Sequence, residues 1–264
     1  MSDLKIGSAK QRSNGQRVLL VGESWFVYSV HQKGFDTFYT SEYTEGGVEF
    51  VDALVASGHS VTRMPAHLVE RDFPRSVSEL RDIADVVIIS DIGANSFLLS
   101  KTTFAKSELD VERIDIIRDF VLEGGALLMV GGYMTFAGID AKARWGRSSL
   151  AEVLPVTVLD RDDRVEIPGG VAPKVVTGHP IVAGLDEVWP NLLGLNEVVA
   201  KPSATTLAVA GAHPLLVVDS AGEGRSAAFT SDLAPHWATP DFLAWSGYGP
   251  LFDRVVRWLA NEAS

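Results

Sequence analysis

The sequence predicts an α/β fold built on a mostly parallel sheet, with β-rich insertions in its second half. Short apolar runs at residues 17–22, 85–90 and 126–130 are typical of buried parallel strands. Stretches with helical spacing separate these runs, an alternation that favours right-handed crossover connections. With 264 residues, 46% of them hydrophobic, the chain is long enough for one large domain with a full core.

The N-terminal part opens with a polar segment, residues 1–16, that we expect to be a disordered lead-in to a domain over residues 17–264. Residues 23–46 follow the first strand and show no pattern that we assign to an element. We therefore expect a long irregular segment there, which at this length is usually a lid, an interface or otherwise functional. It carries seven aromatic side chains: Trp25, Phe26, Tyr28, Phe35, Phe38, Tyr39 and Tyr43.

Helices and a further strand are predicted from spacing and end signals. Apolar residues recur at helical spacing at Val48, Val51, Leu54 and Val55, and Gly58 is placed to end that helix. A strand is expected over residues 60–64. The pair Ser76 and Glu79 has the spacing of a capping box, which predicts the start of a short helix. Another amphipathic helix, closed by Gly124 and Gly125, is marked by Ile114, Ile117, Phe120 and Val121.

The second half changes to short strands separated by turn residues. We expect strands within residues 156–170, 196–200, 205–210, 214–220 and 225–231, with a hairpin loop at residues 221–224. A last helix places Leu251, Phe252, Val255, Trp258 and Leu259 on one face.

Charge and composition exclude several classes of function. The net charge is −11 and the pI about 5.0, without a basic cluster, so nucleic acid is not an expected partner. No apolar run reaches the roughly 18 residues of a membrane span, and the polar N-terminus lacks a secretory core. The absence of cysteine excludes disulfides, thiolate metal sites and cysteine nucleophiles, and fits a cytoplasmic location.

Residues that follow the strands form the predicted site, because ligands of open parallel sheets bind beyond the carboxyl ends of the strands. The side chains and glycines at these positions, in chain order, are Glu23, Ser24, Trp25, Asp91, Asn95, Gly131, Gly132, Tyr133, Met134, Asp232, His236 and Trp237. Gly131 and Gly132 permit a sharp turn after the strand at 126–130. A helix beginning at that turn would direct free N–H groups toward a bound anion.

Three segments carry a resemblance to a known family: LLVGESW, VGGYMTFAGIDAKARWGRSSLAEVLPV and GRSAAFTSDLAPHWATPDFLAWSGYGPLF. They are similar to the class I glutamine amidotransferase-like family of cytoplasmic proteins, over nearly the whole chain beyond the polar N-terminus. The resemblance implies a flavodoxin-like three-layer core. It also implies a nucleophile elbow, G-x-C-x-G, at the turn after residues 126–130.

The chain departs from the family's catalytic pattern at two places. Tyr133 stands where the nucleophilic cysteine belongs, and Thr135 replaces the last glycine of the motif. Ala238 takes the place of glutamate in the family's H-x-E motif, after His236. A tyrosine hydroxyl, with an ordinary pKa near 10, is a poor substitute for a thiolate at neutral pH. We therefore predict no ordinary glutaminase activity.

Several roles for the turn remain open from sequence. Tyr133 could act as an acid or base with His236 and Glu23, with the Met134 N–H completing an oxyanion hole. It could instead line a binding pocket, or simply pack. Our leading hypothesis is a pocket for a small polar or anionic metabolite, with or without turnover. The alternative is a non-catalytic sensor or homo-oligomeric interaction protein that uses the aromatic segments 25–43 and 237–245. For either function we expect a homo-oligomer.

No cofactor or metal is predicted. The six histidines lack H-x-x-x-H or H-E-x-x-H spacing, and neither a dinucleotide nor a P-loop glycine pattern is present. A site with oxygen ligands from Glu23, Asp91 and Asp232 stays open. His179, which precedes a proline, is interpreted as a turn residue.

Overall fold

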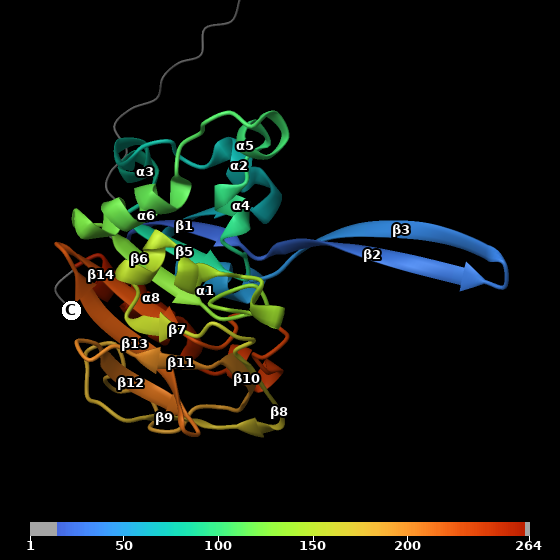
Figure 1. Ribbon diagram of the computed structural model, residues 1–264. Coiled ribbons are helices and arrows are strands. Elements are labelled where there is room, and N and C mark those ends of the chain that lie inside the picture. The colour runs from blue at the N-terminus through green and yellow to red at the C-terminus, as the bar shows by residue number, and fades with distance from the viewer. Residues whose placement is uncertain (1–14, 262–264) are drawn as a thin grey trace, which may run out of the picture.

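An eight-stranded sheet forms the centre of the computed structural model, which describes residues 15–261 (Figure 1). The strands, in spatial order, are β4 (Ser60–Met64), β1 (Arg17–Gly22), β5 (Val86–Ser90), β6 (Ala126–Val130), β14 (Gly224–Phe229), β13 (His213–Ala221), β12 (Thr205–Ala210) and β9 (Pro173–Val175). The five strands from β4 to β14 run parallel, and the last three pairings are antiparallel. The predicted mostly parallel sheet is confirmed.

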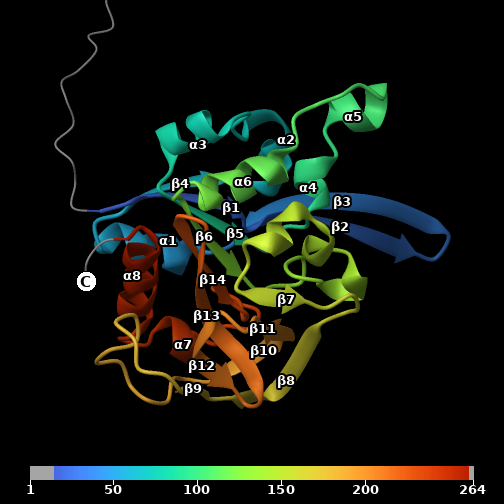
Figure 2. The ribbon, with the colours of Figure 1, turned by 60° about the vertical axis from the view of Figure 1, so that its left-hand side comes forward.

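Helices cover both faces of this sheet and give the flavodoxin-like three-layer architecture (Figure 2). One face carries α1 (Val48–Ala56) and α8 (Tyr248–Leu259), with the short α7 (Pro240–Leu243). On the other face lie α2 (Val69–Asp72), α3 (Val77–Ile83), α4 (Asn95–Leu98), α5 (Lys101–Lys106) and α6 (Arg113–Leu122). Two separate apolar clusters result, because side chains of a strand alternate between the two faces of a sheet.

Most predicted helix signals are confirmed. Ser76 caps α3 by accepting a hydrogen bond from the Glu79 N–H at 3.2 Å, and the apolar face of α6 is fully buried. The prediction for α1 was partly wrong. Its buried side chains are Phe50 and Leu54, whereas Val48 and Val55 are more than half exposed, because the helix presents the Phe50 side to α8.

The second half contains the predicted short strands and few helical turns. Two small antiparallel sheets pair β7 (Val156–Val158) with β11 (Val198–Ala200) and β8 (Arg164–Val171) with β10 (Leu192–Asn196). The predicted hairpin at residues 221–224 joins β13 to β14. Single-turn 3₁₀ helices are η1 (Ala66–Leu68), η2 (Ile139–Ala141), η3 (Trp145–Arg147) and η4 (Ser149–Glu152).

The segment after β1 differs most from its prediction. Instead of an irregular loop, it is a long antiparallel hairpin of β2 (Ser24–Lys33) and β3 (Asp36–Glu45) that projects away from the sheet (Figures 1 and 2). We call residues 24–45 the arm. Its β-branched and aromatic residues favour strands, and Gly34, with φ 63°, begins a two-residue hairpin turn. That combination is the signal that the sequence interpretation missed.

The N-terminal prediction needs one correction. Residues 1–14 lie outside the described part of the chain, but residues 15 and 16 belong to the fold. The Gln16 N–H donates to Nδ1 of His59 at 3.0 Å and ties the chain to the start of β4. Within residues 15–261, no helix is long and apolar enough to cross a bilayer.

Candidate functional site

A pocket of about 320 Å³ lies at the carboxyl edge of the parallel strands. Its lining consists of Glu23, Trp25, Asp91, Tyr133, Asp232, Ala234, Pro235 and His236. Six of the predicted site residues therefore meet in one place. They come from the segments that follow β1, β5, β6 and β14, which are four strands far apart in the sequence.

The remaining predicted residues lie beside or behind this pocket without lining it. Gly131, Gly132 and Trp237 are buried behind Tyr133, and Ser24 uses its hydroxyl to accept from the Ala66 N–H at 2.7 Å. The side chain of Met134 lies next to Gly93. Asn95 is exposed at the start of α4, so the strand-end rule placed it at the right edge but outside the pocket.

Two of the pocket carboxylates are on residues with unusual backbone geometry. Glu23 and Asp91, each directly after a buried strand, have φ values of 50° and 44°. Residues other than glycine rarely adopt this left-handed conformation, which costs about 1–3 kcal/mol and is concentrated at functional sites. Hydrogen bonds hold both residues: Glu23 N–H donates to the Ser90 carbonyl at 3.1 Å, and Asp91 N–H to Oγ1 of Thr135 at 2.9 Å.

The pocket favours the protonated form of Glu23. Its side chain is 2% exposed, and burial together with the nearby negative charges of Asp232 and Asp91 raises its pKa to about 8. The Ser90 hydroxyl, 2.5 Å from Oε1 of Glu23, opposes this rise by stabilising the charged form. Burial, and then the charge of Asp232, also raise the pKa of Asp91.

His236 is paired with Asp232 across one turn of chain. Its Nδ1 lies 3.5 Å from Oδ2 of Asp232, and hydrogen bonding to this carboxylate raises the pKa of the imidazole. The other oxygen of Asp232 accepts the Ala234 N–H at 3.0 Å. The pocket thus combines three carboxyl groups with one imidazole, so its charge is neutral to negative, depending on how many protons it holds.

The turn after β6 does not present free N–H groups to the pocket. No helix begins there, although Gly132 turns the chain with φ 151°. The Met134 N–H donates to Oδ1 of Asp91 at 2.7 Å, and the Gly132 N–H donates to Oδ1 of Asn196 at 3.0 Å. The Met134 N–H that the predicted oxyanion hole would use is therefore already bonded to the carboxylate of Asp91.

The hydroxyl of Tyr133 is also committed to a protein partner. It donates to Oε1 of Glu166 at 2.9 Å, while Nε1 of Trp237 donates to the other oxygen at 3.0 Å. Hydrogen bonding to Glu166 raises the pKa of Tyr133, and the Arg164 guanidinium lies 4.7 Å from the ring centroid. The ring itself lines the pocket and meets the His236 ring edge-on, with centroids 4.2 Å apart.

Three polar residues that position the turn were missed from sequence. Asn196 is fully buried and donates from Nδ2 to the Gly132 carbonyl and to Asp163, at 3.2 and 2.8 Å. The Asp163 carboxylate in turn accepts the N–H groups of Ala137 and Gly138. Glu166, described above, is the third. The charged run at residues 160–166 is a visible signal, but no spacing connects it to the turn.

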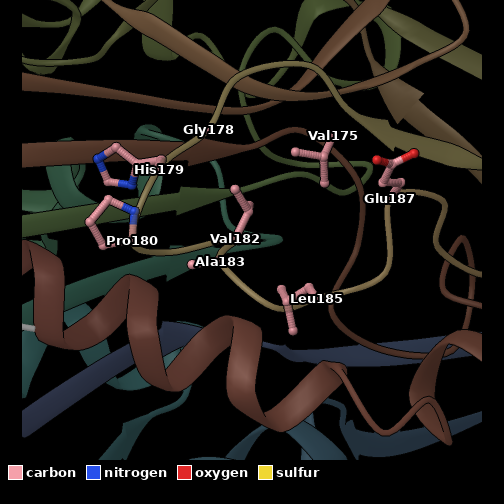
Figure 3. Close-up of a pocket in the computed structure, with 8 residues that line it drawn as sticks. All are labelled: Val175, Gly178, His179, Pro180, Val182, Ala183, Leu185 and Glu187. Carbon is pink, nitrogen blue, oxygen red and sulfur yellow. The ribbon is translucent and has the colours of Figure 1, made fainter.

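A second, larger hollow of about 470 Å³ lies elsewhere, beside α8 (Figure 3). Its lining is mostly apolar, with His179 and Glu187 as the titratable side chains. His179 is a turn residue, as predicted: its Nδ1 accepts the Ile181 N–H at 3.2 Å, and its ring contacts Trp258. Burial lowers the pKa of this imidazole, which favours its neutral form. The hollow lacks the convergent polar groups of the strand-end pocket.

Among residues 15–261, no group of three or more histidine, aspartate or glutamate side chains is arranged to hold a metal ion. Glu23, Asp91 and Asp232 share the pocket but do not form such a ligand set. Their mutual repulsion instead contributes to the raised pKa values of Glu23 and Asp91.

Comparison with known proteins decides the family. A family model described as "Putative glutamine amidotransferase" matches residues 17–261. The chain belongs to this glutamine amidotransferase-like family. Cytoplasmic protein STM3548 from Salmonella typhimurium is 41% identical, with a TM-score of 0.89 over 92% of this chain and 98% of its own. Cytoplasmic protein STM1381 from Salmonella typhimurium LT2 is 40% identical, with a TM-score of 0.88 over the same shares.

More distant structures share the fold alone. A ThuA-like protein from Parabacteroides merdae is 11% identical, with a TM-score of 0.57 over 92% of this chain and 89% of its own. No curated protein matches the chain. The family model and the two Salmonella structures thus show the family.

Proposed function

We propose that the strand-end pocket binds a small polar molecule that is neutral or positively charged and rich in hydrogen-bond donors. The observation that carries this proposal is the convergence of Glu23, Asp91 and Asp232 on one pocket, where His236 lies beside Asp232. Carboxyl oxygens accept hydrogen bonds from hydroxyl and ammonium groups. The rings of Trp25 and Tyr133 add apolar faces, as in a site for a sugar-like or amine-bearing ligand.

The same geometry argues against the anionic half of the prediction from sequence. An anionic ligand would face three carboxyl groups, and the turn's N–H groups that would attract it already bind Asp91 and Asn196. It would therefore be repelled at close range without compensating donors. A metabolite whose only charge is a carboxylate or phosphate is accordingly disfavoured.

Glutamine hydrolysis by the family's usual route is not part of this proposal. The chain has no cysteine, and Tyr133 stands in its place with a raised pKa and a hydroxyl bonded to Glu166. Any turnover would use Glu23 and His236 as proton carriers, since a carboxyl group with a pKa of about 8 exchanges protons near neutral pH. Tyr133 would then serve as a pocket wall.

A non-catalytic sensor is the second candidate, and one observation favours it. The Met134 N–H donates to Asp91 and is not free to stabilise an oxyanion, an interaction that contributes much to acyl-transfer catalysis. For both candidates we propose that the protein works in the cytoplasm, as the names of its relatives STM3548 and STM1381 suggest.

Thermal unfolding with matched ligands tests the proposal. Glucose, glucosamine and glucuronate share one skeleton and differ in charge, as do glutamine and glutamate. A ligand at a hundred times its dissociation constant adds about 2.7 kcal/mol, which raises the Tm of a chain of this size by roughly 5–10 °C. Across these and further matched pairs, we expect the neutral or cationic ligands to raise the Tm. This rise should be smaller in Asp232→Asn and unchanged in Asn95→Ala. Shifts confined to anionic members would contradict the proposal.

Turnover separates the two candidates once a ligand is found. An enzyme predicts product formation that Glu23→Gln abolishes while binding survives. A sensor predicts binding without product in the wild type.

A further inference from the structure

Beyond its base, the arm has one face without charge and one face that carries charges. At the base of the first face, Glu45 accepts a hydrogen bond from the Tyr43 hydroxyl and pairs with Arg63. The pairing of β2 with β3 places Phe26, Tyr28, Val30, Tyr39 and Tyr43 on the same face, and the neighbouring side chains Gln32, Thr37 and Ser41 are uncharged. We call this the aromatic face. The charged side chains Lys33, Asp36 and Glu42 lie on the opposite face, together with Trp25, which lines the pocket.

The aromatic face is covered at its base and bare beyond it. Phe26 and Tyr43 pack against the ring of His67, with centroids 5.5 and 5.2 Å away. Further out, Tyr28, Val30 and Tyr39 are 76%, 64% and 74% exposed. A lone two-stranded hairpin is marginally stable in water, and contiguous exposed apolar surface of this kind marks interaction sites.

From this asymmetry we infer that the aromatic face pairs with the same face of a second copy of this chain, forming a dimer through crossed arms. The chain carries a net charge of −11, so two copies repel one another wherever charged surfaces meet. The aromatic face offers a self-complementary contact that avoids this repulsion. A two-fold axis would place the base of one arm against the tip of the other.

The available area is sufficient for such a dimer. With about 200 Å² for a whole aromatic side chain, the exposed parts of the aromatic face amount to roughly 500 Å² per arm. Two arms that cover one another completely would bury roughly 1,000 Å², which is the lower bound for a biological interface. A nucleic acid or an anionic membrane is a poorer occupant, because the arm carries Asp36 and Glu42 beside Lys33 and lacks a basic cluster.

Sedimentation velocity of the full chain tests this inference. We expect a dimer for the wild type and an unchanged dimer for Ser29→Glu. For Val30→Glu we expect the dissociation constant of the dimer to rise at least about tenfold, in favour of monomer. Ser29 is the adjacent residue on the opposite face, paired with the neutral Thr40, so it controls for added charge on the arm. A monomeric wild type, or equal dissociation by both variants, would overturn the inference.

A second measurement stands independently of how Val30→Glu folds. Because the chain has no cysteine, Val30→Cys and Ser29→Cys each introduce a unique thiol. A short bis-maleimide should link two copies of Val30→Cys and leave Ser29→Cys unlinked. A dimer in which neither variant is linked, or both equally, would place the interface elsewhere. The pocket is not involved, so a failed dimer would leave the proposed ligand site untouched.

Discussion

The strand-end pocket and the arm differ in which side chains they bury and which they expose, although they are adjacent in the chain. In the pocket, the polar groups of Glu23, Asp91 and the turn after β6 are buried, and each has a partner in the described part of the molecule. On the arm, apolar side chains such as Tyr28 and Val30 are exposed without a cover. The polar groups of the pocket are therefore satisfied within one chain, whereas we propose that the exposed face of the arm is covered by a second copy.

The largest expected effect concerns the proton on Glu23. Its pKa is about 8 when folded, well above the ordinary value of 4.5, so the folded chain binds the proton more tightly than the unfolded chain. The stabilisation is therefore full below about pH 4.5 and is lost as the pH rises to about 8, a change on the order of 3–5 kcal/mol. Urea unfolding measures the free energy of unfolding of wild type and of Glu23→Gln at each pH. The difference between the two values should change by that amount across this pH range. Parallel pH profiles for the two chains would contradict the account.

Asn196 tests whether the turn depends on its buried hydrogen bonds. Asn196→Ala removes the partners of the Gly132 N–H and carbonyl and one partner of Asp163, all of them buried. We expect a loss of about 3 kcal/mol in the free energy of unfolding, measured in urea. Asn95→Ala, at the exposed start of α4, should stay within about 0.5 kcal/mol of wild type. An equally small effect at Asn196 would mean that the turn holds its shape without this residue.

Tyr133 sharpens the comparison because its ring and its hydroxyl have separate tasks. Tyr133→Phe keeps the ring in the pocket wall and loses the bond to the exposed Glu166, so we expect about 1 kcal/mol of destabilisation and intact ligand binding. Thermal unfolding with and without a ligand checks both. Loss of binding or turnover in this variant would show that the hydroxyl acts within the pocket, as one sequence-based hypothesis had it.

A tyrosine on the arm should give the smallest effect. Tyr39→Ser removes a ring that is 74% exposed, so within one chain we expect a change in unfolding free energy of at most about 0.5 kcal/mol. Urea unfolding at a protein concentration low enough to keep chains apart measures this value. A loss of several kcal/mol under those conditions would mean that the ring packs within its own chain.

Much of the fold could be predicted from sequence because buried parallel strands are continuous apolar runs. The apolar runs at β1, β5 and β6 predicted which residues follow the strands at the carboxyl edge of the sheet. Six of the residues predicted by the strand-end rule line the pocket. Asn95 and Met134 satisfy the same rule and lie outside the lining, since the rule gives the edge of the sheet but not the direction of a side chain. The arm was missed because its alternation was weighed as an aromatic-rich loop.

The electrostatic character of the site could not be predicted in the same way. Asp163, Glu166 and Asn196 come from the β-rich second half, and the sequence gives no spacing that joins them to Tyr133. Whether the Met134 N–H is free depends on a hydrogen bond to Asp91, 43 residues away in the chain. Contacts of this range follow from packing, so the sequence could place these residues at one edge of the sheet but could not predict which N–H groups are already bonded.

A direct titration of Glu23 tests the central claim that three carboxyl groups crowd one pocket and retain a proton there. Carbon-13 NMR of the glutamate carboxyl signals, assigned with Glu23→Gln, would follow its protonation from pH 4 to pH 9. The account predicts a midpoint near pH 8 that moves lower in Asp232→Asn, because a neighbouring negative charge is removed. A midpoint near the ordinary glutamate value, unchanged by Asp232→Asn, would contradict it.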